Sequence, residues 1–153
     1  MAEKSKKNKP YLNQRIGLIG ELLVQKVAVQ YVDFCFRTCT GHPADLIIDH
    51  QNKLYRVQVK TRHKSLTNGK QQYCFEYGSR SKVEAHNTYP IEIYAFCFMP
   101  EGDVEFKAYN SDSFTNYITE GKHLNKNTGA ESLQNAFADL NKTPEINISD
   151  YIQ

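Results

Sequence analysis

Two strand-like runs separated by a short polar stretch constrain the fold of this chain more than any other feature. Residues 44–49 and 54–60 are rich in apolar and β-branched side chains, and the stretch between them has the composition of a hairpin turn. With Gln51-Asn52 as a two-residue loop, pairing outward from it places Asp45 opposite Gln58. The sequence therefore predicts a β-hairpin with a defined register.

The alternation of side chains along a strand sorts the hairpin residues onto two faces. The more polar face is predicted to carry Asp45, Ile47, Asp49, Leu54, Arg56, Gln58 and Lys60. The apolar face is predicted to carry Leu46, Ile48, Tyr55, Val57 and Val59. A carboxylate, an amide and an ammonium group are thus expected to converge on one patch.

Such a patch has the chemistry of a magnesium site. Mg²⁺ takes oxygen ligands, typically one or two carboxylates together with substrate phosphate. Asp45 offers a carboxylate, Gln58 a side-chain carbonyl, and Val59 a backbone carbonyl. Lys60 is suited to positioning water or offsetting phosphate charge. In isolation, an ordinary polar hairpin surface explains this pattern better, so the interpretation depends on the rest of the chain.

A helix is predicted from about Asn13, which is a suitable N-cap. Its apolar face comprises Ile16, Ile19, Gly20, Leu23, Val27 and Tyr31, and further apolar residues widen the face, so we expect a well-buried helix. Glu21 lies at the margin, where an acid is costly unless it is paired or binds a cation. Gly17 and Gly20 are expected to let the helix approach a sheet closely. The alternative for Glu21 is a solvated position on the helix shoulder.

The remaining elements complete a single α/β domain over residues 13–153, preceded by a basic disordered arm over residues 1–12. The expected strands are 33–40, 72–77, 89–99 and 104–109, and strand 89–99 is expected to be central because it is apolar on both faces. The expected helices are 112–120 and 130–141. The expected polar connections are 61–70 and 78–88.

Charge is segregated along the chain despite a net charge of only +2. Residues 53–82 contain eight Lys or Arg and one acid, whereas residues 83–153 contain eleven acids and four bases. A basic band around the polar hairpin face is typical of a polyanion-binding protein. No apolar run reaches the roughly 18 residues of a membrane span, and the N-terminus lacks a signal-peptide core, so we expect a cytoplasmic protein located with the genomic DNA.

The cysteines leave one alternative open. Cys35 and Cys39, with His42 nearby, have the composition of a zinc half-site, but alternate strand positions explain the two cysteines better. All four cysteines are expected to be reduced.

A glutamate helix followed by "HPADLII" and "YRVQVKT" within residues 14–61 resembles the PD-(D/E)XK nuclease superfamily. The later "IEIYAFCFMPEGDVEFKAYN" is similar to the strand pair that closes such domains, so the likeness covers about two-thirds of the chain. Within the superfamily the chain most resembles small intron-encoded homing endonucleases, and more distantly archaeal Holliday junction resolvases. The resemblance implies a restriction-endonuclease-like core, with a central mixed β-sheet flanked by helices.

The resemblance also implies roles for four residues and a cofactor, Mg²⁺ or Mn²⁺. Asp45 and Gln58 correspond to metal ligands, Glu21 to a supporting acid, and Lys60 to the residue that directs water or phosphate. Ala44 separates Pro43 from Asp45, and Gln58 stands where an acid is usual, which weakens metal binding. Glutamine does occur there in active members.

The expected partner is double-stranded DNA. The residues expected to contact it are Lys4, Lys6, Lys7, Lys9, Arg15, Arg62, Lys64, Lys70, Gln71, Gln72, Arg80 and Lys82, with Asn68 as a further candidate for base reading. Cutting both strands requires at least a homodimer, and the resemblance suggests a tetramer. A junction-selective nuclease and a catalytically inactive DNA-binding relative remain alternatives, the latter because of Gln58.

Overall fold

The computed structural model describes residues 9–76, 90–109 and 116–141. Its elements, in chain order, are α1 (Lys9–Ala28), β1 (Phe34–Arg37), β2 (Leu46–His50), β3 (Lys53–His63), β4 (Ser65–Thr67), β5 (Lys70–Glu76), β6 (Ile93–Met99), β7 (Asp103–Ala108), β8 (Asn116–Thr119) and α3 (Thr128–Leu140). Neither helix in this part of the chain has the length and apolarity needed to span a bilayer.

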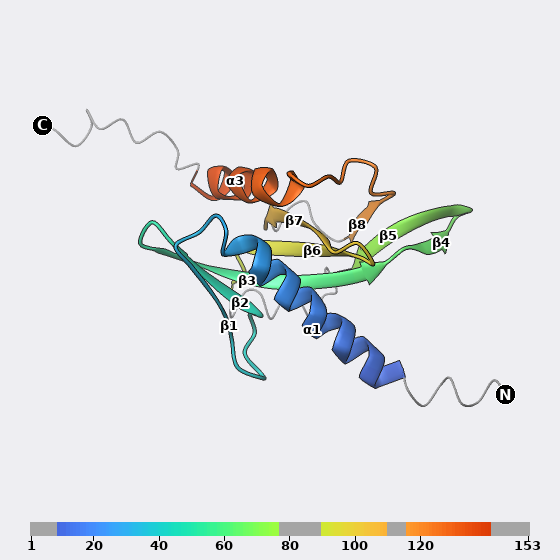
Figure 1. Ribbon diagram of the computed structural model, residues 1–153, viewed down its shortest axis with the longest axis horizontal. Helices are drawn as coiled ribbons and strands as arrows, with labels where there is room; N and C mark the ends of the chain where they lie inside the picture. The colour runs from blue at the N-terminus through green and yellow to red at the C-terminus, as the bar shows by residue number, and fades with distance from the viewer. Residues whose placement is uncertain (1–8, 77–89, 110–115, 142–153) are drawn as a thin grey trace, which may run out of the picture.

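The strands in the described part of the chain form two sheets. The larger has five strands in the order β1-β2-β3-β6-β7, and the smaller has three in the order β4-β5-β8. Within the larger sheet β3 and β6 are parallel, and the other neighbours are antiparallel. The chain is therefore a single α/β domain with a central mixed sheet and packed helices, as predicted (Figure 1).

The predicted hairpin register is confirmed. His50 pairs with Lys53 across the loop, and the ladder continues to Leu46 opposite Val57. Gln51 and Asn52 both have positive φ, 51° and 62°, which suits the two-residue turn of a twisted hairpin. The ladder ends there: the Asp45 N–H donates to the Val57 carbonyl, so the predicted placement of Asp45 directly opposite Gln58 lies beyond the paired residues.

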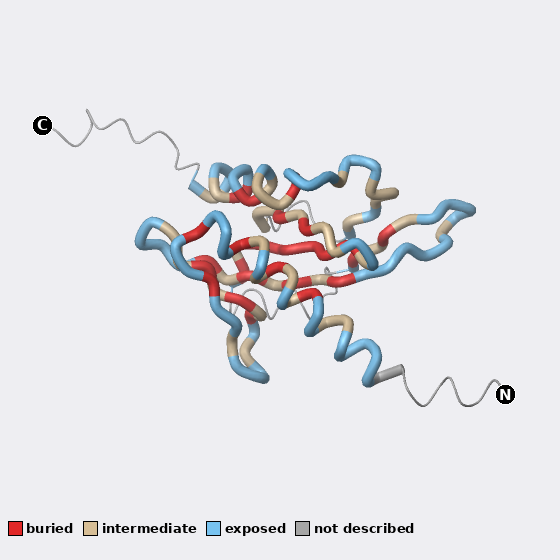
Figure 2. The backbone as a smooth tube through the Cα atoms, in the orientation of Figure 1, coloured by how far each residue is buried: buried red, intermediate tan, exposed pale blue. Residues whose placement is uncertain are grey.

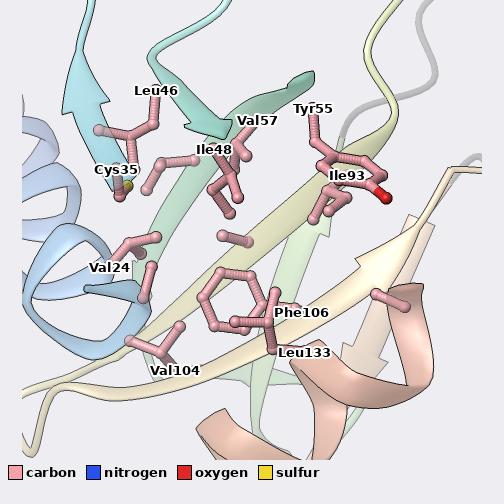
Figure 3. Packing of buried hydrophobic residues seen from close by; sticks show 14 of the residues in the cluster. Val24, Cys35, Leu46, Ile48, Tyr55, Val57, Ile93, Val104, Phe106 and Leu133 are labelled. Carbon is pink, nitrogen blue, oxygen red and sulfur yellow. The ribbon is translucent and has the colours of Figure 1, made fainter. Parts of the chain in front are cut away.

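Helices α1 and α3 pack on the same face of the five-stranded sheet. Val24 of α1 and Leu133 of α3 meet the apolar face of the hairpin and the matching face of β6 and β7 (Figure 3). The predicted apolar residues Leu46, Ile48, Tyr55, Val57 and Val59 are all buried. The helix layer thus rests on the hairpin face opposite Gln58 and Lys60.

An aromatic cluster covers the other face of the sheet. Phe96 of β6 lies 4.8 Å from Phe75 of β5 and 4.9 Å from Tyr117 of β8, measured between ring centroids. Because β6 is buried on both faces, the prediction of a central strand is confirmed. The predicted helix 112–120 is wrong from residue 116 onward, because β8 pairs with β5 and the Tyr117 ring packs on Phe96; its earlier residues lie outside the described part.

Helix α1 differs from its prediction in two ways. It begins at Lys9 rather than near Asn13, so residues 9–12 of the predicted disordered arm are helical; proline at position 10 is tolerated because first-turn N–H groups have no intrahelical partner. The expectation of a well-buried helix is also wrong: Gly20, Val24 and Ala28 are buried, whereas Leu22 is 46% exposed. The helix touches the sheet along one narrow line.

The predicted polar connection 61–70 is largely strand. β3 continues to His63, and β4 and β5 form an antiparallel ribbon closed by Asn68-Gly69. This ribbon extends beyond the five-stranded sheet (Figure 1). Residues 1–8 and the predicted connection 78–88 lie outside the described residues.

Candidate active site

Asp45 lies where β2 and β3 begin to separate. Its backbone N–H donates to the Val57 carbonyl (2.9 Å). Its side-chain carboxylate, rather than a backbone carbonyl, accepts the next hydrogen bond from β3. Asp45 Oδ2 accepts hydrogen bonds from the Val59 backbone N–H (2.8 Å) and from Gln58 Nε2 (2.9 Å). Oδ2 accepts both of these hydrogen bonds, which fix the orientation of the carboxylate. Neither bond involves Oδ1.

Gln58 therefore acts on Asp45 in this structure. Its amide N–H₂ group donates to the carboxylate, an assignment that the acceptor-only chemistry of an ionised aspartate requires. The predicted role of the Gln58 carbonyl as a metal ligand stays a prediction. The observed bond adds a second role, the orientation of Asp45.

Glu21 reaches the site because α1 approaches β3 without an intervening side chain. A Cβ atom on Gly20 would lie 1.8 Å from Thr61 Oγ1, so only glycine permits this separation. A Cβ on Gly17 would meet nothing within 4 Å, so the predicted close approach holds at Gly20 alone. Thr61 is itself buried, and among the described groups its Oγ1 has no hydrogen-bond partner.

Two clefts meet at Glu21. The first, of about 410 Å³, is lined by Glu21 and Asp45 together with Arg37, His42 and the segment between them. The second, of about 460 Å³, is lined by Glu21 and Lys60 together with Val59, Thr61, Arg62 and His63. The structure therefore brings the predicted acids together in one cleft and places the predicted lysine in the adjoining one.

The environment of the two carboxyl groups disfavours their charged forms and raises the pKa of each. Burial raises the pKa of Asp45, while the Val59 N–H bond and the Lys60 charge oppose that rise. Burial also raises the pKa of Glu21, the Asp45 carboxylate raises it further, and Arg37 lowers it through a hydrogen bond and its charge. Desolvated acids that repel each other gain stability from a cation placed between them.

This donor set fits Mg²⁺. Among the described residues there is no group of three or more His, Cys, Asp or Glu able to hold a metal, so a site here rests on two carboxylates. Mg²⁺ is ordinarily bound in that way, by one or two carboxylates completed by waters and substrate phosphate. Glu21 and Asp45 would hold it, with the Gln58 and Val59 oxygens as predicted additional ligands.

Sequence reasoning missed Arg37. Its Nη2 lies 3.2 Å from Glu21 Oε2 in a pair whose side chains are 39% and 27% exposed. Strand alternation places Arg37 on the same face of β1 as Cys35, but only the structure shows that α1 covers that face, because Cys35 is buried beneath the helix. His42 also lines the first cleft and was considered only as a zinc ligand.

The cysteine alternative gains no support from the structure. Cys35 is buried, and burial raises the pKa of its thiol to about 11, which disfavours the thiolate that zinc requires. Cys39 is exposed in the segment beyond β1. None of the four cysteines forms a disulfide.

The residues predicted to bind DNA cluster only in part. Arg62, Lys64, Lys70 and Gln71 are exposed and Gln72 is half-buried, all along the end of β3 and the β4–β5 ribbon (Figure 2). Arg15 is exposed on α1. Lys4, Lys6, Lys7, Arg80 and Lys82 lie outside the described residues, as does the side chain of Lys9.

We expect the substitution Arg37→Gln to strengthen divalent-cation binding about two- to fivefold, because an exposed ion pair contributes up to about 1 kcal/mol and Arg37 competes with a cation for Glu21. The measurement is the Mg²⁺ dissociation constant obtained from the rise of the melting temperature with Mg²⁺ concentration. Arg62→Gln, which removes a charge from the second cleft without touching the Glu21 pair, is the control. Weaker cation binding in Arg37→Gln would contradict competition.

Comparison with known proteins gives a structural match only. No protein-family model matches the chain, and no curated protein sequence matches it. Among solved structures, the bacterial homing endonuclease I-Ssp6803I superposes with a TM-score of 0.54 at 12% sequence identity, over 85% of this chain and 97% of that chain. At this identity the match shows a shared fold.

Proposed function

We propose that this chain is a Mg²⁺-dependent, site-specific double-strand DNA endonuclease of the homing type, within the PD-(D/E)XK superfamily. The observation that carries the proposal is the meeting of Glu21 and Asp45 in one cleft with Lys60 in the next. The fold shared with a homing endonuclease supports it. The protein would act on genomic DNA in the cytoplasm.

The reaction is phosphodiester hydrolysis. Bound Mg²⁺ (or Mn²⁺) lowers the pKa of a water and offsets negative charge on the phosphate. Gln58 and the Val59 N–H fix the Asp45 carboxylate before substrate arrives, so little reorganisation is required during reaction. Lys60 donates hydrogen bonds to the phosphate oxygens or to the attacking water, and stabilises the charge that develops there.

The basic ribbon would hold the duplex. Arg62, Lys64 and Lys70 contact phosphates, which position DNA without reading its sequence. Gln71 and Gln72 offer paired donors and acceptors for base edges in the major groove, which admits a two-stranded β-ribbon. A symmetric dimer supplies two sites for two strands, and a long target favours the predicted tetramer.

The test is a cleavage assay with Mg²⁺ on linear duplexes carrying candidate insertion sites. The wild-type protein is expected to cut one sequence, and Lys60→Ala is expected to cut none while still binding DNA. Equal cutting by both proteins would show that the proposed active site does not catalyse the cleavage. Preferential cutting of four-way junctions over every linear duplex would instead identify a junction resolvase.

A non-catalytic DNA-binding protein is the second candidate, favoured by the Gln58–Asp45 hydrogen bond in place of a second strand carboxylate. It predicts salt-sensitive DNA binding that survives chelation, with no metal-dependent cutting. Gln58→Glu separates the two candidates: cutting that appears only in this variant shows that the natural protein lacks one ligand.

A further inference from the structure

Helix α1 exposes an unusual amount of apolar surface. The exposed large apolar residues in and just after the helix are Tyr11, Leu12, Leu18, Ile19, Leu22, Val29 and Tyr31, with exposed fractions from 43% to 68%. Val29 continues the last turn, because its N–H donates to the Gln25 carbonyl (2.9 Å). Single exposed apolar residues are ordinary, but several of them along one helix mark an interaction surface.

The strip has the spacing of a coiled-coil seam. Residues 11, 15, 18, 22, 25 and 29 alternate in steps of four and three, so they share one side of the helix, away from buried Gly20 and Val24. We call these six residues the α1 seam. Four of them are apolar, and the two polar members, Arg15 and Gln25, stand at equivalent distances from its two ends.

This symmetry makes the seam complementary to itself. The six positions are spaced symmetrically about Gly20, so the spacing is the same in either direction along the helix. A second copy running antiparallel therefore sets Leu18 against the partner's Leu22 at the centre. Arg15 then faces the partner's Gln25. Gln25 Nε2 already donates to the Cys35 carbonyl (3.1 Å), so the amide oxygen is the group of this side chain that can accept a hydrogen bond from a guanidinium.

We propose that the α1 seam is the surface through which two copies of this chain associate about a twofold axis. An amphipathic helix lying on a lipid surface is the competing occupant. The seam favours a second copy, because its polar residues interrupt the apolar strip at positions that pair with each other, whereas a lipid surface selects an uninterrupted apolar face.

The antiparallel dimer also determines where the two active-site clefts lie, and this consequence rests on the proposed nuclease function. Glu21 flanks the seam on one side, and Ile19 flanks it on the other. An antiparallel twofold brings like flanks together, so the two clefts that contain Glu21 open on the same side of the pair. Two active centres on one side suit the cutting of both strands of a single duplex.

Sedimentation equilibrium of the full chain over a wide range of concentration tests the association. The seam spans about 27 Å of helix, which is small for an interface, so we expect a dissociation constant in the micromolar range. Leu22→Glu is expected to weaken association at least about a hundredfold, by placing a carboxylate in the apolar centre. Leu66→Glu, at a leucine on β4 that is 69% exposed against 46% for Leu22, is the control for the same substitution outside the seam and should associate as the wild type does.

Cysteine cross-linking tests the antiparallel register, in a Cys39→Ser background because Cys39 is exposed. Ile19→Cys should form a covalent dimer with itself across the axis, whereas Lys26→Cys should cross-link only when mixed with Leu12→Cys. A monomer at all concentrations, equal effects of Leu22→Glu and Leu66→Glu, or self-cross-linking of Lys26→Cys would overturn the proposal.

Three further outcomes distinguish the α1 seam from a membrane-binding surface and from the proposed nuclease function. A monomer that sediments with phosphatidylcholine–phosphatidylserine vesicles would assign the seam to a membrane and overturn the second copy. A protein that dimerises through the seam but cuts no DNA would overturn the proposed function alone, whereas a monomer that cuts both strands would overturn the seam alone.

Discussion

Replacement of Asp45 by asparagine is expected to reduce Mg²⁺-dependent DNA cleavage by at least about a hundredfold while leaving DNA binding in place. The asparagine side-chain oxygen can still accept the hydrogen bond from the Val59 N–H, so the strand geometry is kept. What is lost is the charge that holds a cation beside Glu21. Single-turnover cleavage and a gel-shift assay with Ca²⁺ in place of Mg²⁺ measure the two effects separately.

Asp49→Asn is the matched control, because Asp49 lies on β2, which begins directly after Asp45, but lines neither cleft. It should cut at the wild-type rate.

The same Asp45→Asn variant should also change the dependence of the unfolding free energy on pH. Because burial raises the pKa of Asp45, wild-type stability falls as the pH rises through the range above the ordinary aspartate value, and Asp45→Asn should flatten that fall. Unchanged cleavage by Asp45→Asn would exclude Asp45 from the reaction.

Substitution of alanine at two neighbouring glycines of α1 is expected to have opposite effects on stability. Gly20→Ala forces a Cβ against Thr61 Oγ1, at 1.8 Å before relaxation, so α1 must move away from β3. Overpacking of this kind costs about 1–3 kcal/mol of unfolding free energy. Gly17→Ala meets nothing within 4 Å and gains up to about 1 kcal/mol of helix propensity.

Urea denaturation measures both free energies, and Thr61→Ala in the Gly20→Ala background should restore part of the loss. Gly20→Ala should also weaken cation binding, because the displaced helix carries Glu21 away from Asp45. If Gly20→Ala and Gly17→Ala have the same stability, the contact with Thr61 does not fix the position of α1.

The sequence predicts the centre of this fold well because local chemistry determines it. Gln51-Asn52 adopts the positive φ values of a primed turn, and with a two-residue loop the register of the hairpin from His50 opposite Lys53 to Leu46 opposite Val57 follows without any tertiary information. The double-sided apolar pattern of β6 likewise requires burial on both faces. These predictions depend on short-range spacing alone.

Other features required long-range packing. The apolar residues of α1 indicate a helix, but a period of 3.6 cannot tell a face that packs on the sheet from a face that is left exposed. Residues 116–119 form a strand because the edge of β5 and the ring of Phe96 are available to them. Arg37 joins the site because β1 lies beside β2 under α1, and no local motif marks that adjacency.

The central claim is that Glu21 and Asp45 share one divalent cation. Isothermal titration calorimetry of Mn²⁺ binding to the wild type, Glu21→Gln, Asp45→Asn and the double variant measures it without DNA or catalysis. We predict that each single substitution weakens binding by at least about tenfold and that the double variant loses less than the sum of the two binding free energies, as expected for groups that act on one ion. Binding by Glu21→Gln equal to that of the wild type would contradict the claim.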